Sequence, residues 1–204
     1  MPKTLERNLR HPKRVSAPTR IPLTRRQCET LIESGELKGR FELIDGEIIS
    51  KMGQKRPHSL SMVLLVRWLT AEFGPLYVQI QSPVNVAKAD NPTNEPEPDG
   101  VVLHDVATAY PDGNPNPQDI ALLVELADSS LRFDLQTKAA LYSRAGIADY
   151  WVVDILGRKL YVHREPTLEG YRDVMVYAED EMAAPLAKPD VMVRVGELLP
   201  PMVA

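Results

Sequence analysis

Ile120-Ala-Leu-Leu-Val-Glu-Leu126 is a nearly continuous run of apolar residues. Such a run is typical of a β-strand that is covered on both faces of its sheet. A helical stripe from Leu135 to Tyr142 follows and ends at Gly146, and Tyr150-Trp-Val-Val-Asp154 is a second apolar run. A strand, a helix and a strand in this order predict two parallel strands joined by a right-handed crossover.

The segments on either side of this unit predict hairpins, which would make the sheet mixed. Further strands are expected at 77–81, 84–88, 99–104, 158–164 and 171–177. Two apolar-rich runs flank Asp45-Gly46, a strong hairpin signal. Helices are expected over 25–33, where Thr24 and Gln27 form a capping-box pattern, and over 58–73. The predicted fold class is α/β, with a mixed central β-sheet flanked by helices.

The composition is that of one globular domain. The chain has 204 residues, of which 44% are hydrophobic and 25% charged, so a sizeable core is possible. We expect six side chains to be buried in it: Leu64, Trp68, Leu122, Val124, Trp151 and Val153. No apolar run is long enough to span a membrane. Cys28 is the single cysteine, which favours a reducing compartment, and a cytoplasmic location is predicted.

The charge is unevenly distributed along the chain. Residues 1–26 hold eight Lys or Arg and one acid, so of the 24 basic and 28 acidic residues in total, 16 and 27 remain for the rest. We therefore divide the chain into a basic, disordered N-terminal arm at 1–22 and a domain at 23–204. The arm is either a solvated tail or a segment that contacts a phosphate backbone non-specifically.

Glu125 is the most informative single residue. It interrupts the apolar run Leu-Leu-Val-Glu-Leu, where an isolated carboxylate would be costly to desolvate. Such a group needs a cation, a network of hydrogen bonds or a raised pKa. The alternative is that Glu125 lies at a strand end, where it reaches solvent or pairs with an arginine.

Two further residues become informative when they are taken with Glu125. Asp99 ends the stiff string Glu95-Pro-Glu-Pro-Asp99, although Pro-Asp-Gly is also common turn chemistry. Lys138 lies on the helix after Glu125, although it could simply form a surface pair with Asp134. Two carboxylates and a lysine are the groups that metal-assisted hydrolysis of a phosphodiester needs. The carboxylate oxygens suit Mg²⁺ or Mn²⁺, and the lysine could orient or deprotonate water or stabilise an oxyanion.

The order of several short motifs resembles the Uma-type family of restriction-endonuclease-like proteins, within the PD-(D/E)XK nuclease superfamily. The matching positions are Arg40-Phe-Glu-Leu-Ile-Asp-Gly-Glu47, His58, Pro98-Asp99, Val124-Glu125, Ser129-Ser130, Asp134, Lys138, Tyr142, Gly146 and Tyr150–Asp154. Together they span roughly residues 24–200. Each motif is short, but their joint order and spacing are specific.

The resemblance implies a restriction-endonuclease-like fold with Asp99 and Glu125 as metal ligands. The superfamily's lysine normally stands two residues after the acid, where this chain has Ala127. The family pattern implies that the lysine has moved to the next helix, which nominates Lys138. Glu42 is then a candidate accessory catalytic residue and His58 a candidate phosphate or metal contact. Glu42 could instead be an exposed strand residue, and His58 could be a polar residue at a helix start.

These inferences predict a Mg²⁺- or Mn²⁺-dependent endonuclease that hydrolyses DNA, with RNA as an alternative substrate. A homodimer is expected because a duplex presents two antiparallel strands. The histidines are scattered without metal-ligand spacing, which argues against a histidine zinc site. The sequence has no Gly-rich phosphate loop and no Gly-X-Ser-X-Gly motif, so it does not support a nucleotide-triphosphate site or a serine hydrolase. The main alternative is a non-catalytic nucleic-acid-binding or regulatory protein on the same scaffold.

Overall fold

The computed structural model describes residues 20–51, 53, 55–110 and 113–202. Most of the predicted basic arm therefore lies outside the described residues. The helices and strands are α1 (Arg25–Glu33), β1 (Phe41–Ile44), β2 (Glu47–Ser50), α2 (Arg56–Phe73), β3 (Val78–Ile80), β4 (Gly100–Leu103), β5 (Ile120–Ala127), α3 (Leu131–Phe133), a π-helical turn η5 (Asp134–Lys138), α4 (Ala139–Ala145), β6 (Asp149–Asp154), β7 (Lys159–Arg164), β8 (Asp173–Ala178), β9 (Met182–Ala183) and β10 (Val193–Arg194). Within the described ranges, no helix has the length and apolar character needed to cross a membrane.

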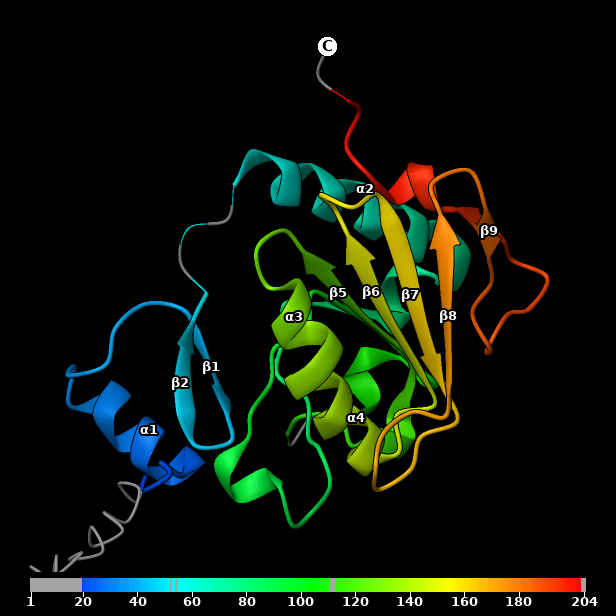
Figure 1. The fold of residues 1–204 in the computed structure, drawn as a ribbon. Helices are drawn as coiled ribbons and strands as arrows, with labels where there is room; N and C mark the ends of the chain where they lie inside the picture. The colour runs from blue at the N-terminus through cyan, green and yellow to red at the C-terminus, as the bar shows by residue number, and fades with distance from the viewer. Residues whose placement is uncertain (1–19, 52, 54, 111–112, 203–204) are drawn as a thin grey trace, which may run out of the picture.

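The central sheet has six strands in the order β3-β4-β5-β6-β7-β8. Strands β5 and β6 are parallel, and every other neighbouring pair in this sheet is antiparallel. The segment α3-η5-α4 connects the parallel pair, and Figure 1 shows it crossing one face of the sheet. The predicted mixed sheet and its parallel unit are thus confirmed.

A separate hairpin, β1-β2, stands beside the sheet (Figure 1). Its turn residues Asp45 and Gly46 have φ values of 49° and 75°, as a tight two-residue hairpin turn requires. A Cβ atom at Gly46 would lie 2.2 Å from Cβ of Pro22, so only glycine fits here. The turn also anchors the hairpin, because the Gly46 amide donates to the Thr93 carbonyl at 2.8 Å.

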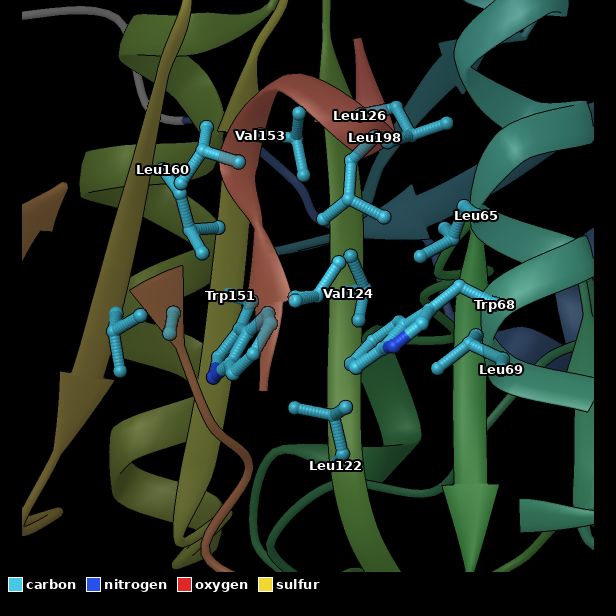
Figure 2. Packing of buried hydrophobic residues seen from close by; sticks show 14 of the residues in the cluster. Leu65, Trp68, Leu69, Leu122, Val124, Leu126, Trp151, Val153, Leu160 and Leu198 are labelled. Carbon is cyan, nitrogen blue, oxygen red and sulfur yellow. The ribbon is translucent and has the colours of Figure 1, made fainter. Parts of the chain in front are cut away.

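Helix α2 covers one face of the sheet. Leu65, Trp68 and Leu69 pack against side chains of β5 and β6, as Figure 2 shows. The rings of Trp68 and Trp151 are stacked, with centroids 5.7 Å apart. Of the six predicted core residues, five are buried, but Leu64 is only partly buried and Leu65 takes its place. Apolar residues lie on several sides of α2. The three- and four-residue spacing in the sequence was therefore compatible with more than one buried face, and it did not distinguish Leu64 from Leu65.

Helix α4 covers the opposite face. Leu141 and Tyr142 belong to a second buried cluster with Leu123, Tyr150 and Val152. Along β5, the odd-numbered residues 123 and 127 face this helix, whereas 122, 124 and 126 face α2. This alternation is the ordinary period of a strand, and it turns Glu125 toward α4.

The predicted strand at 84–88 is wrong. Val84 and Val86 are buried, which explains the apolar alternation in the sequence. Their amides, however, donate to the Pro96 carbonyl and to the Asn91 side chain rather than to a neighbouring strand. Burial alone therefore produced a strand-like pattern in an irregular segment.

Candidate functional site

The register of β4 and β5 brings Asp99 and Glu125 together. Gly100 is paired with Val124 across these antiparallel strands, so the residue before Gly100 lies opposite the residue after Val124. Opposed residues point to the same face of a sheet. Asp99 and Glu125 are both buried, with exposed fractions of 4% and 3%.

The Asp99 carboxylate is held by three donors. Oδ2 accepts a hydrogen bond from the Leu126 amide at 2.9 Å, and Oδ1 accepts one from Nε2 of Gln81 at 3.2 Å. Nε2 of His58, in the first turn of α2, lies 3.3 Å from Oδ2. Burial raises the pKa of Asp99, but the His58 contact and the nearby Lys51 charge outweigh it and lower that pKa overall. Asp99 is therefore held as an anion.

Lys138 joins the hairpin to the sheet. Its Nζ lies 2.9 Å from Oε1 of Glu125 and 2.9 Å from Oε2 of Glu42. Glu42 comes from β1, and its Oε2 also accepts a hydrogen bond from the Glu97 amide at 3.2 Å. The Lys138 side chain is 3% exposed, so this ammonium is enclosed by carboxylates and does not reach bulk solvent.

The π-helical turn η5 determines where Lys138 points. Single π-helical turns are frequent at functional sites because the extra residue rotates the side chains that follow. Asp134 and Lys138, the first and last residues of η5, are both buried. Asp134 accepts a hydrogen bond from Oγ of Ser130 at 2.5 Å. The alternative of an exposed Asp134–Lys138 surface pair is therefore wrong.

The site holds more negative than positive charge. Burial lowers the pKa of Lys138, whereas the neighbouring carboxylates of Glu125 and Glu42 raise it. The net result is a raised pKa. Burial raises the pKa of Glu125 to about 8, against the opposing effect of Lys138 and with support from Asp99 and Asp134. The pKa of Asp134 is raised by burial as well. Without a further cation, the site therefore favours taking up a proton.

All five residues that the sequence nominated line one cavity of about 170 Å³: Glu42, His58, Asp99, Glu125 and Lys138. Glu42 is 4% exposed and Lys138 2% exposed, so the alternatives of an exposed strand residue and of a surface pair do not fit. The cavity is also lined by Lys51, Lys55, Asp128, Ser129, Ser130 and Asp134. Asp128 thus adds a further carboxylate to the lining of the cavity.

Sequence reasoning missed the part that two residues play in orienting the acids. Tyr142 donates a hydrogen bond from its hydroxyl to Oε1 of Glu125 at 3.1 Å, and Gln81 contacts Asp99. Asp134, considered in the sequence as a surface partner of Lys138 and as a position that matches the family, lies inside the site. The spacing of Asp134, Lys138 and Tyr142 by four residues was a usable signal, because such residues share one face of a helix. No sequence signal pointed to Gln81.

The donor set suits a hard divalent cation. Mg²⁺ is commonly bound by one or two carboxylates, several waters and a substrate phosphate. Asp99 and Glu125 supply two carboxylates in one cavity, and Oε2 of Glu125 takes no part in the contacts to Lys138 and Tyr142. Among the described residues, no group of three or more His, Cys, Asp or Glu side chains is arranged as a complete metal site. The residues thus fit a cation that keeps much of its hydration.

The mixed sheet, its flanking helices and the acidic site on its central strands define a restriction-endonuclease-like fold. Residues 28–197 match the Uma2 family, described as "putative restriction endonuclease". The chain belongs to this family.

Two further comparisons concern individual proteins. The structure is similar to the crystal structure of a putative nuclease of the DUF820 family from Anabaena variabilis, with a TM-score of 0.62 and 16% sequence identity. The similarity covers 87% of this chain and 97% of the other. At this identity the likeness concerns the fold alone. No curated protein matches the chain.

Proposed function

We propose that this protein is a Mg²⁺- or Mn²⁺-dependent endonuclease that hydrolyses phosphodiester bonds of DNA, with RNA as an alternative substrate. The observation that carries the proposal is the convergence of Asp99, Glu125 and Lys138 on one cavity. Asp99 immediately precedes β4, Glu125 lies in β5 and Lys138 ends the π-helical turn η5, and each is buried although it is ionisable. Membership of a nuclease family supports the same reaction class.

Asp99 and Glu125 would hold the metal ion. When bound, the ion would lower the pKa of a water molecule and neutralise charge on the phosphate. The chain's contribution is to keep both carboxylates oriented. The Leu126 amide, Gln81 and His58 fix Asp99, and the Tyr142 hydroxyl fixes Glu125.

Lys138 would act as a fixed positive charge. Its raised pKa keeps it an ammonium group, which donates hydrogen bonds but does not accept a proton. Of the roles open to it, orienting the attacking water and stabilising charge on the phosphate oxygens are therefore favoured over deprotonating that water. Glu42 would position Lys138 through their 2.9 Å contact.

A homodimer would suit a duplex substrate, because a two-fold axis relates the two antiparallel strands. Analytical ultracentrifugation of the full chain, with and without duplex DNA, tests this part of the proposal. A monomer in both conditions would contradict it without affecting the proposed chemistry.

Nicking of supercoiled plasmid is the direct test of activity. Wild type should nick DNA with Mn²⁺ or Mg²⁺, and a chelator should abolish nicking. Glu125→Ala and Lys138→Ala should both be inactive, with folding checked by circular dichroism, and Lys38→Ala is a matched control because Lys38 is exposed and lies outside the cavity. A wild type that behaves like Glu125→Ala on varied DNA and RNA substrates would favour the non-catalytic binding protein.

A further inference from the structure

Two lysines, Lys51 and Lys55, line the cavity and form no ion pair with a described carboxylate, although the Lys51 charge acts at longer range on Asp99 and Glu125. Lys51 donates a hydrogen bond from Nζ to the carbonyl of Glu97, which is uncharged. Lys55 also lines the cavity and forms no ion pair with any described residue. Lys138, by contrast, contacts two carboxylates. The two ammonium groups on this wall are thus available to an anion.

The start of helix α2 adds to the positive charge of this wall. Lys55 is its N-cap residue and makes no side-chain capping bond, and the first turn carries no acidic residue. The helix instead opens with Arg56, followed by Pro57. Basic residues at a helix N-terminus are unfavourable, because the helix dipole is positive at that end. A bound anion would offset this cost.

His58, in the first turn of α2, contacts Asp99 and offers the cavity no free ring nitrogen. Its Nε2 contacts Asp99, whereas its Nδ1 is buried and has no hydrogen-bond partner among the described residues. The wall therefore combines two ammonium groups that form no ion pair with a described residue and a helix start that has no side-chain cap.

The size of the cavity restricts what the anion can be. At about 170 Å³ it is smaller than the roughly 300–1,000 Å³ of pockets that enclose small-molecule ligands. It suits a phosphate group better than a whole nucleotide. The bases of a bound strand would then lie outside, where the protein could not read them through this cavity.

We propose that Lys51, which follows β2, and Lys55, the N-cap residue of α2, form a phosphate-binding wall that holds the backbone of the nucleic-acid strand against Asp99 and Glu125. This inference rests on the proposed function and extends it, because it assigns the substrate-binding side of the site. Binding through this wall depends on backbone charge and not on base sequence.

The test measures binding without cleavage. A fluorescein-labelled DNA duplex is titrated with the full chain in EDTA, and fluorescence anisotropy is recorded from 50 to 300 mM salt. For Lys51→Gln/Lys55→Gln, affinity at the lowest salt should fall at least roughly tenfold. The slope of log Kobs against log salt should become shallower by about 1.8, since each phosphate contact contributes about 0.9.

Two matched variants control for charge and fold. Lys38→Gln/Lys88→Gln removes two exposed lysines that do not line the cavity and should change the slope little. Lys51→Arg/Lys55→Arg keeps the charge and should bind with nearly the wild-type slope. All variants are compared by thermal unfolding, and any that is unfolded is replaced by the corresponding single substitution.

The outcomes separate this inference from the proposed activity. If the glutamine variant binds as wild type does, or if wild type does not bind, the phosphate-binding wall is overturned, even when wild type nicks plasmid. If the glutamine variant loses affinity and slope while the control does not, the wall is supported, even when no protein cleaves DNA.

Discussion

Nζ of Lys138 lies 2.9 Å from Oε1 of Glu125, although 13 residues separate them in the chain. The usual lysine position of the superfamily, two residues after the acid, is Ala127 here, and its side chain is buried in the core. The helix after β5 thus brings an ammonium group to Glu125 from a different direction.

Glu125→Ala should weaken Mn²⁺ binding and reduce nicking at least roughly 100-fold. Even changes outside the direct ligands of a metal cost about 10–100-fold, and Glu125 is a proposed ligand in an otherwise apolar strand. Isothermal titration calorimetry with Mn²⁺ measures the affinity directly. Wild-type affinity in this variant would remove Glu125 from the metal site.

Lys138→Ala should also abolish nicking but leave Mn²⁺ affinity unchanged or increased. The substitution removes a positive charge close to the proposed cation position, and like charges repel. The same titration checks this, with plasmid nicking in parallel. A variant that loses metal affinity together with Glu125→Ala would show that Lys138 supports the shape of the site.

The metal-free protein should lose stability as the pH rises from about 4.5 toward 8. The pKa of Glu125 is raised from 4.5 to about 8 in the folded protein, so the folded state binds more protons than the unfolded state in this window. The stabilising contribution is complete below the unfolded pKa and is lost as the pH passes through the folded one. Thermal unfolding in EDTA across this range measures it.

Glu125→Gln is the control for that pH dependence, because an amide does not titrate. Its melting temperature should vary less with pH than that of wild type over the same window. Equal pH slopes for the two proteins would assign the effect to other groups, of which Asp134 is the first candidate since its pKa is raised too.

Trp151→Ala should cost about 3–5 kcal/mol of unfolding free energy, as expected for a large buried side chain. Trp151 is fully buried and stacks on Trp68, so its removal leaves a cavity between the sheet and α2. Urea denaturation gives the value. Leu156→Ala should change stability by less than about 0.5 kcal/mol, because Leu156 is 71% exposed. Similar losses in both variants would contradict the core assignment.

Deletion of residues 1–20 should weaken DNA binding at low salt and leave the fold unchanged. The deleted arm is basic, and such segments act through salt-sensitive phosphate contacts. Of the deleted residues the structure describes Arg20, which forms an exposed pair with Glu47, and pairs of this kind are worth about 0–1 kcal/mol. Anisotropy titrations at two salt concentrations decide the matter. Equal affinity and salt slope would make the arm a tail without this role.

The sequence by itself determined the elements whose signals are local. The Asp45-Gly46 turn, the capping box at Thr24 and the apolar runs of β5 and β6 each depend on neighbouring residues, and each is present in the structure. The position of Glu125 within an apolar run likewise showed that a buried charge needed a partner. Local conformational preference and the cost of burying a charge act before the fold is complete, so they can be read from the chain.

Only the tertiary structure decided which partner each buried charge has. Glu42 reaches Lys138 because the β1-β2 hairpin stands beside the sheet, and His58 reaches Asp99 because the first turn of α2 lies next to the start of β4. The choice of Leu65 over Leu64 for the core was also made by packing. A helix that is apolar on several sides could bury any of them, and an acid could pair with any of several cations, so the local sequence does not choose between these arrangements. The packing of distant segments makes the choice, because it buries one face of the helix and brings one counter-charge to the acid.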